Sequence, residues 1–156
     1  MTQTAVALST DARAIIVEAL NQSVAETAVT TMLAQNFHWN VTGMAFGPLH
    51  DLFQKIYEDH FVAQDDLAER VKALNAHAEG TLAGMLKRSK IKEHDGHATD
   101  KEMIETMQAA QEALAATLAG AGALAADHGD TLTEDLCIAR GQEHEKFAWF
   151  LRSHLA

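Results

Sequence analysis

Histidine and carboxylate side chains in one stretch of the chain have the types and spacing of metal ligands. His50 follows His38 by twelve residues, Asp65 follows His50 by fifteen, and Glu69 lies four residues beyond Asp65. Imidazole nitrogens and carboxylate oxygens together bind metals such as iron and zinc. On a helix, Asp65 and Glu69 share one face, where like charges destabilise the helix by about 0.2–0.5 kcal/mol unless a cation compensates. These residues indicate metal binding.

Each of these features also has an ordinary structural explanation. Arg70 and Lys72 lie beside the two carboxylates and would give an ion-paired surface, which is common on helices. His38 precedes Trp39, and a histidine in that setting is more often a packed interior residue. His50 falls in the expected first turn of a helix, where the helix dipole does not favour a charged imidazole. The case for a metal therefore depends on the residues acting together.

A metal site inside a single helical bundle is poorly supported by the pattern. Di-iron sites of that kind use Glu-x-x-His motifs that project into the core. None of the nine histidines has a glutamate three residues earlier. No two histidines are four residues apart either, so the helix-borne pair of zinc hydrolases is missing as well.

Long helices are expected to position these residues. The chain has 156 residues with one proline and nine glycines, and its 47% hydrophobic and 22% charged residues are typical of a globular protein. Apolar residues recur at helical spacing in four stretches. These stretches are residues 11–37, 48–74, 99–124 and 131–151.

Start signals accompany three of the four stretches. Pro48 suits a first helical turn. Thr99 with Glu102, and Thr131 with Glu134, have the spacing of a capping box. The apolar positions expected to face the core include Ile15, Met32, Phe61 and Leu132.

The connections between the stretches predict the fold. About ten residues join the first helix to the second, and a few join the third to the fourth. Residues 75–98 form a longer connection, with a short helix expected around Thr81–Lys87 and a polar turn at residues 94–97. We expect an all-α, ferritin-like four-helix bundle with a short extra helix in the long connection between helices two and three. It forms a single domain over residues 1–156, with residues 1–10 as a short N-terminal extension.

Helix geometry constrains how the candidate ligands can meet. His50 and Asp65 lie on the same predicted helix, and a rise of 1.5 Å per residue separates their Cα atoms by about 22 Å. They cannot bind one metal ion within one chain. They can do so if the helix meets an antiparallel copy of itself across a two-fold axis, which gives two equivalent sites between subunits.

The segments that carry these residues resemble the Dps family, the mini-ferritins named as DNA-binding proteins from starved cells. The likeness lies in residues 37–43, 49–50, 65–71 and 144–152, which read FHWNVTG, LH, DDLAERV and HEKFAWFLR. The order of the helices and the long crossover fit as well. The resemblance therefore extends over nearly the whole chain.

The resemblance implies a homo-oligomer, a hollow dodecamer, that acts as a ferroxidase. Such shells oxidise Fe(II), usually with hydrogen peroxide and otherwise with O2, and store ferric mineral inside. Iron is thus the implied cofactor and cargo, and protection against oxidative damage is the implied role. In the family, two histidines of one subunit face an aspartate and a glutamate of its two-fold partner. Here these positions are His38 and His50, opposite Asp65 and Glu69.

One position departs from the family pattern. The family normally has a carboxylate four residues after the second histidine, and this chain has Gln54 there. A neutral amide oxygen binds iron more weakly than a carboxylate does. We expect the iron position of His38, Asp65 and Glu69 to be intact. The second, formed by His50, Gln54 and a shared Glu69, is expected to be weakened. The alternative is that water or Glu69 completes it at no cost.

Asp130 and Glu134 mark a second acidic region, at the start of the last helix. In the resembling family this region lines pores that admit iron, and a ring of acids draws cations inward. Acids at a helix N-terminus also compensate the helix dipole and cap the backbone. Both interpretations stay open.

DNA and membranes are disfavoured as partners. Acidic residues outnumber basic ones 22 to 12, and residues 1–10 contain no lysine or arginine. The basic cluster Lys87, Arg88, Lys90 and Lys92 fits a solvated loop. The uncharged run rich in alanine and glycine at residues 113–126 is shorter than the ~20 residues of a spanning helix. We expect a cytoplasmic protein, with nucleoid association left open and at most weak DNA binding.

Two other function classes remain as rivals. The first is a structural or DNA-protecting shell with a weakened ferroxidase centre, for which Gln54 is the best support. The second is a hydrolase, which ranks low because no nucleophile elbow is present. A polar turn is preferred over a surface metal site for His94, Asp95 and His97. Trp39 and Trp149 are expected in the core or at an interface, and Cys137 as a buried small residue.

Overall fold

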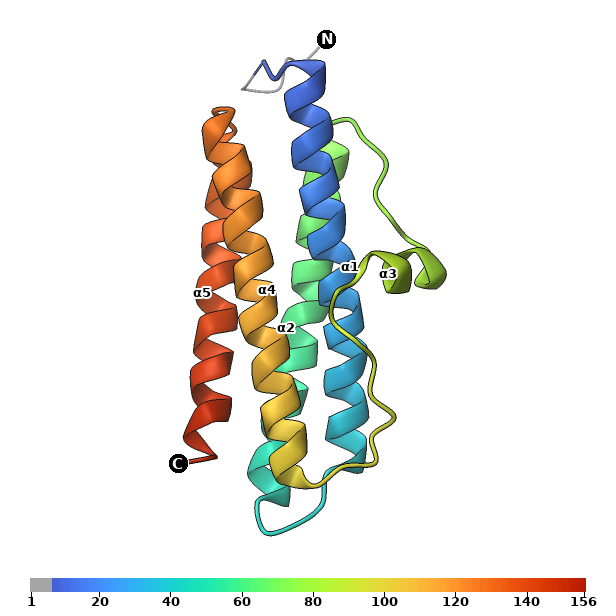
Figure 1. Cartoon of the computed structure of the whole chain (residues 1–156), viewed down its shortest axis with the longest axis vertical. Helices are drawn as coiled ribbons and strands as arrows, with labels where there is room; N and C mark the ends of the chain where they lie inside the picture. Colours follow the sequence, from blue (N-terminus) through green and yellow to red (C-terminus); the bar gives the residue numbers. More distant parts are fainter. Residues whose placement is uncertain (1–6) are drawn as a thin grey trace.

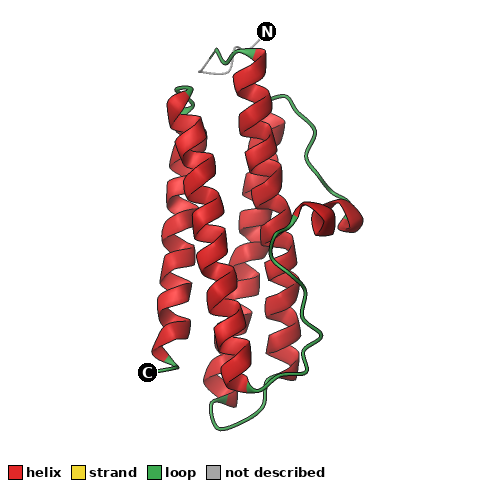
Figure 2. Cartoon of the chain, viewed as in Figure 1, coloured by secondary structure: helices red, strands yellow, loops and turns green. Residues whose placement is uncertain are grey.

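The computed structural model describes residues 7–156, and this part of the chain consists of helices joined by loops (Figures 1 and 2). Five helices follow one another along the described residues. They are α1 (Thr10–Asn40), α2 (Phe46–Ala73), α3 (Leu82–Arg88), α4 (Asp100–Asp127) and α5 (Thr131–Ser153). The predicted all-α class is confirmed, as is the short helix in the long connection.

The four long helices form a bundle in which α1 packs against α2 and α4 against α5 (Figure 1). α1 and α2 are antiparallel neighbours joined by the short loop of residues 41–45, which is about half the predicted length. α2 and α4 run in the same direction, so the chain must return along the full length of the bundle between them. This return carries α3 on the outside of α1, and it explains why residues 74–99 form the longest connection.

Side-chain caps start four of the five helices in residues 7–156, the exception being α2, and one of the two predicted capping boxes is wrong. Thr99 and Glu102 form the predicted reciprocal pair at the start of α4. At α5 the cap is Asp130, whose carboxylate accepts the backbone N–H of Thr133 at 3.2 Å. Thr131 is therefore the first helical residue and not the cap, because the chain already enters the helix one residue earlier.

The core fills the space between the helices with apolar side chains of α1, α2, α4 and α5. Its largest fully buried members include Phe37, Phe53, Met103, Leu114 and Leu151. Four positions expected in the core are instead exposed: Ile15, Met32, Phe61 and Leu132. They lie on the flanks of the apolar stripes or on outward faces, which a single bundle does not cover. Trp39 and Trp149 are also more than half exposed, which excludes the core for both.

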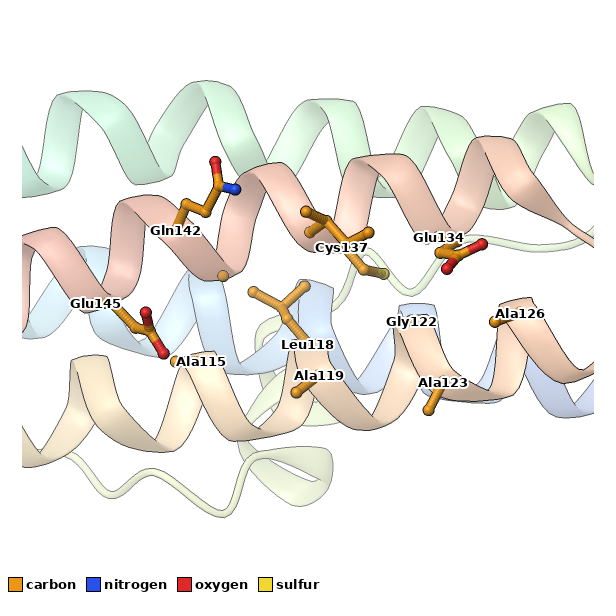
Figure 3. A pocket seen from close by; sticks show the side chains of 12 residues that line it. Ala115, Leu118, Ala119, Gly122, Ala123, Ala126, Glu134, Cys137, Gln142 and Glu145 are labelled. Carbon is orange, nitrogen blue, oxygen red and sulfur yellow. The ribbon is translucent and has the colours of Figure 1, made fainter.

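α4 and α5 approach each other closely because small residues line their contact. A Cβ atom added at Gly122 of α4 would lie 3.2 Å from the Cβ atom of Cys137 on α5. The two helices border an open groove of about 310 Å³ lined mainly by alanine and glycine, with Glu134 and Glu145 at its edges (Figure 3). Cys137 is buried, as expected, and burial raises the pKa of its thiol to about 11, with a further contribution from the charge of Asp130.

Polar side chains of α1 hold the long crossover in place. The Asn21 side chain donates to the His77 carbonyl and accepts the Glu79 N–H, with distances of 3.0 and 2.9 Å. Farther along, the buried Glu26 carboxylate accepts the Lys90 N–H, and the Asn36 amide donates to the His94 carbonyl at 2.7 Å. These hydrogen bonds give partners on α1 to backbone N–H and C=O groups of the crossover that would otherwise have none.

Two predictions concern the ends and the surroundings of the chain. Of the N-terminal extension predicted for residues 1–10, residues 1–6 lie outside the described part. None of the helices in residues 7–156 is both long enough and apolar enough to cross a membrane.

Candidate metal centre

His38 and His50 lie face to face where α1 and α2 meet. Their ring centroids are 3.7 Å apart and the ring planes differ by 18°. His38 is three residues from the end of α1 and His50 is in the second turn of α2, so the short loop of residues 41–45 brings the two rings together. The separation of twelve residues in the sequence thus spans the end of α1, the loop and the start of α2.

Reciprocal hydrogen bonds fix the tautomer of both rings. His38 donates its Nδ1–H to the His50 carbonyl at 2.7 Å, and His50 donates its Nδ1–H to the His38 carbonyl at 2.8 Å. A carbonyl oxygen only accepts, so each Nδ1 must carry the proton. In the neutral form of each ring, Nε2 then keeps a lone pair for a ligand, the arrangement that orients histidines at metal sites.

Aromatic neighbours complete the setting of the histidine pair. Phe46 stacks on His50 with ring centroids 5.2 Å apart, and Tyr57 meets the edge of the His38 ring at 5.3 Å. His38 is only 8% exposed and His50 is half-buried. The hydrogen bonds and ring contacts therefore hold both rings in place, and His50 keeps part of its surface exposed to solvent.

Asp65 and Glu69 lie exposed on α2. Neither side chain makes a hydrogen bond or ion pair with another described residue. The bases that might have neutralised them are engaged elsewhere. Arg70 pairs with Asp130 at 2.8 Å, and the Lys72 ammonium donates to the Ala76 carbonyl at 2.8 Å. The ion-paired surface that offered the alternative explanation does not form.

One chain brings the two histidines together but keeps them apart from the two carboxylates. His50 and Asp65 are both in α2, so the helical rise places their Cα atoms about 22 Å apart. Within residues 7–156, no three histidine, cysteine or acidic side chains cluster closely enough to hold a metal ion. A single subunit therefore carries two separated halves of the predicted ligand set.

Gln54 lies one turn after His50 and is half-buried. Its amide donates to the Glu58 carboxylate at 2.7 Å. This hydrogen bond engages the nitrogen of the amide and leaves the Gln54 oxygen as the group that can face a metal. Asp51, the acid nearest to His50 in sequence, is exposed and points about 100° away around the helix.

The acidic region at the start of α5 divides into two different environments. Asp130 is fully buried, where it caps α5 and pairs with Arg70. In a single chain its carboxylate thus has the capping role that was the alternative for this position. Glu134 is partly exposed beside the groove between α4 and α5. A pore that admits iron stays a prediction, and it now depends on Glu134.

A second polar cluster, which the sequence reasoning missed, lies buried in the middle of the bundle. Arg140 makes a two-pronged contact with Asp59, at 2.6 and 3.1 Å. Asp59 accepts from Nδ1 of His60, and Gln111 bridges His60 to Nδ1 of His144. This network joins α2, α4 and α5 through consecutive hydrogen bonds.

Burial controls the protonation of this network. Desolvation lowers the pKa of His144 to about 2, with further lowering from His60 and Arg140, and desolvation also lowers the pKa of His60. For Asp59, desolvation acts in the opposite direction, but hydrogen bonds from His60 and Arg140 outweigh it and hold its pKa well below the ordinary value. Both histidines are therefore neutral, and the only charges are the paired Asp59 and Arg140.

A sequence signal for this cluster existed. His60 lies between Ile56 and Ala63 on the buried stripe of α2, and Gln111 lies between Met107 and Leu114 on that of α4. Polar residues at core positions need buried partners. His60 and His144 fit neither the Glu-x-x-His spacing nor the four-residue spacing of paired histidines, so motifs for metal ligands do not reveal them.

The remaining candidate residues form local structure. In the crossover, His94 Nδ1 accepts the Gly96 N–H at 3.0 Å, and the Asp95 carboxylate accepts the His97 N–H at 2.9 Å. This is the predicted polar turn. Hydrogen bonds from the backbone are the main reason that the pKa of Asp95 is lowered.

Comparison with known proteins identifies the family to which this fold belongs. The ferritin-like domain family matches residues 17–156. General stress protein 20U of Bacillus subtilis is 33% identical over 90% of this chain and 97% of its own length. DNA protection during starvation protein 2 of Bacillus anthracis is 32% identical over 90% of this chain and 96% of its own length.

Solved structures give the same result. The Dps protein of Vibrio cholerae, described as a member of a superfamily of ferritin-like diiron-carboxylate proteins, superposes with a TM-score of 0.92 at 30% identity, covering 100% of this chain and 98% of its own. The Dps protein of Bacillus brevis also gives a TM-score of 0.92, at 32% identity, over 96% of this chain and all of its own. The chain belongs to the ferritin-like proteins and, among them, to the Dps family.

Proposed function

We propose that the protein is an iron-oxidising and iron-storing mini-ferritin whose sites form between two subunits. His38 and His50 of one subunit and Asp65 and Glu69 of its two-fold partner bind Fe(II). Hydrogen peroxide is the proposed oxidant: each molecule takes one electron from each of two Fe(II) ions and, with two protons, leaves as two waters. The ferric product is stored inside a closed shell of identical subunits, the proposed dodecamer.

The geometry of the histidine pair is the observation that carries this proposal. Two stacked rings have both Nδ1 atoms occupied by backbone carbonyls, so Nε2 is the ring nitrogen left on each of them for a metal. Such preorganisation is costly to maintain without a ligand, and it suits a divalent metal. The carboxylates that complete the set are exposed and without ion-pair partners among the described residues.

The family membership supports iron as the metal. The Vibrio cholerae protein is described as related to diiron-carboxylate proteins, and His, His, Asp and Glu form a mixed nitrogen and oxygen ligand set suited to Fe(II). Consuming Fe(II) and peroxide in one reaction removes both reagents that generate hydroxyl radical. Protection from oxidative damage follows from this chemistry.

A shell that protects DNA without efficient iron oxidation is the second candidate, and Gln54 is the observation that favours it. Two relatives are named for protection of DNA during starvation. The formal charge of −10 argues against tight contact with DNA in this chain. We propose that protection acts chiefly through removal of iron and peroxide, so DNA should show no salt-sensitive retardation by the protein.

The experiment that separates the two candidates follows ferric absorbance after peroxide is added to Fe(II)-loaded protein. The Asp65→Ala/Glu69→Ala variant should oxidise iron at least about tenfold more slowly, because it lacks the metal-binding carboxylates. Asp66→Ala is the matched control, since Asp66 is exposed on the same helix but turned about 100° from Asp65. Equal rates for wild type and the double variant would refute the ferroxidase proposal.

A further inference from the structure

The outward face of α2 carries a large apolar side chain that the bundle does not cover. Phe61 is 70% exposed and lies between the two halves of the proposed site, eleven residues after His50 and four before Asp65. At 100° per residue, His50, Gln54, Phe61 and Asp65 fall within about 60° of one another around the helix. Phe61 therefore faces in the same direction as the proposed ligands.

This inference rests on the proposed function, in which α2 pairs with α2 of the partner subunit in an antiparallel arrangement. That pairing determines which residues of the two helices lie opposite each other. If His50 lies opposite the partner subunit's Asp65 in an antiparallel pair, each step forward along one helix is matched by a step back along the other. The residue numbers of any two opposed residues therefore have the same sum. The same pairing puts Gln54 opposite the partner subunit's Phe61 and Tyr57 opposite the partner subunit's Glu58. Each contact occurs twice, because the pair is related by a two-fold axis.

The chemistry of the opposed residues is compatible throughout. His50 meets an acid, and the Tyr57 phenol meets a carboxylate that can accept its proton in a hydrogen bond. No two like charges are brought together at these positions. Glu58 already accepts from Gln54 in its own chain, so the Gln54 stem is held flat along the helix beneath the opposed aromatic ring.

We infer that the partner subunit's Phe61 lies over Gln54 and closes the second metal position of the site. The position then lacks a carboxylate and also lacks the space that a hydrated iron ion needs to enter it. One subunit supplies the histidines and the amide, and its partner supplies Asp65, Glu69 and the aromatic cover. The site consequently binds one iron ion tightly, and its resting state is mononuclear.

Anaerobic Fe(II) titration by calorimetry tests this inference with four proteins. Wild type, Gln54→Glu and Phe61→Ala should each bind one tight iron per site. The double variant Gln54→Glu/Phe61→Ala should bind two, because only it has both the carboxylate and the space. Two tight irons in Gln54→Glu alone would overturn the role of Phe61.

Control variants separate the failure of this inference from the failure of the proposed function. Gln54→Glu/Val62→Ala should still bind one iron, since Val62 is 60% exposed but lies about 100° from Phe61 around α2. His38→Ala/His50→Ala should bind none tightly. If that variant binds iron as wild type does, the proposed site itself is wrong; if it loses the iron and Gln54→Glu binds two, only the cover by Phe61 is wrong.

A second measurement tests the register without any metal. In the Gln54→Cys/Phe61→Cys variant, a short bismaleimide should join two subunits into a covalent dimer. Gln54→Cys/Lys72→Cys is the control, because Lys72 lies about 16 Å beyond Phe61 along α2. Cys137 is buried and does not compete. Cross-linking of the control but not of the Phe61 pair would contradict the proposed register.

Discussion

Single hydrogen bonds decide the chemistry of the histidines in this protein. The carbonyls of His50 and His38 each hold the other ring's Nδ1 proton, so the ring nitrogens that remain free are defined by the backbone. His60 and His144 have their protons fixed in the same way, but by Asp59 and Gln111, deep inside the bundle. The two pairs therefore differ in access rather than in tautomer: one can reach a ligand from the surface and the other cannot.

The buried network makes stability depend on pH. The pKa of His144 is lowered to about 2 by burial, against an ordinary value of 6.5. Below pH 6.5 His144 binds a proton in the unfolded chain but not in the folded chain. The free energy of unfolding therefore falls as the pH falls towards 2. His60 acts in the same direction. Asp59, whose pKa is also lowered, adds a loss at pH values below its ordinary 3.8.

His144→Asn tests this dependence, because the asparagine amide can still donate to Gln111 but does not titrate. The free energy of unfolding of wild type should fall between pH 6.5 and pH 4, by up to about 1.4 kcal/mol per pH unit for each buried histidine, and the thermal midpoint should drop with it. The variant should lose a clear part of that slope. His128→Asn, at an exposed histidine, should keep it. Identical slopes in all three proteins would show that His144 is not the titrating group.

At the residue scale, the sequence predicted the chemical types but not all of the partners. The resemblance to the Dps family placed His38 and His50 in one ligand set, and the structure shows that a helix, a short loop and a helix bring their rings together. The partners of Arg70 were not predictable, since Asp130 lies 60 residues further on and the acids next to Arg70 in sequence were the obvious choice. Local charge patterns do not reveal which ion pair is buried.

Close packing of α4 against α5 gives the first prediction at the scale of elements. Gly120 faces open space, so Gly120→Ala should stabilise the protein by about 0.5–1 kcal/mol through the lower entropy of the unfolded chain. Gly122→Ala should bring no such gain, because its new methyl group would press on Cys137. Denaturant unfolding of both variants measures the difference. An equal gain at both positions would mean that the helices are not in close contact at Gly122.

The start of α5 gives a second prediction. Asp130→Ala should lower the free energy of unfolding by more than the roughly 1–2 kcal/mol typical of a lost helix cap, because it also leaves Arg70 without its partner. Asp130→Asn keeps an oxygen for the cap and should lose less. If both variants were as stable as wild type but took up iron slowly, Asp130 would belong to a pore and not to the helix start.

Helix existence was predictable because the apolar stripes are long and few residues interrupt them. The helix boundaries were less predictable. α1 extends to Asn40 and α2 begins at Phe46, so the loop between them has about half of the predicted length. The capping spacing also fitted both Asp130 with Thr133 and Thr131 with Glu134. Asp130 is the cap in the structure, where it is buried against Arg70 of α2. A local sequence pattern cannot contain this contact, because it joins two different helices.

At the scale of the whole molecule, one subunit carries only separated parts of the proposed site. The bundle hides its own core, yet it leaves Phe61, Trp39 and Trp149 more than half exposed. The sequence placed Trp39 and Trp149 in the core or at an interface; the fold excludes the core, and the interface stays a prediction. The length of α2 alone already required that a site built from His50 and Asp65 join two subunits.

The central claim is that the site is divided between subunits, and complementation tests it most directly. A His38→Ala/His50→Ala subunit and an Asp65→Ala/Glu69→Ala subunit should each be inactive alone. Reassembled together in equal amounts, half of the two-fold pairs are mixed and one of the two sites in each is intact, so about a quarter of the wild-type rate of peroxide-driven iron oxidation should return. A mixture as inactive as its parents, with wild type regaining its full rate after the same treatment, would contradict the account.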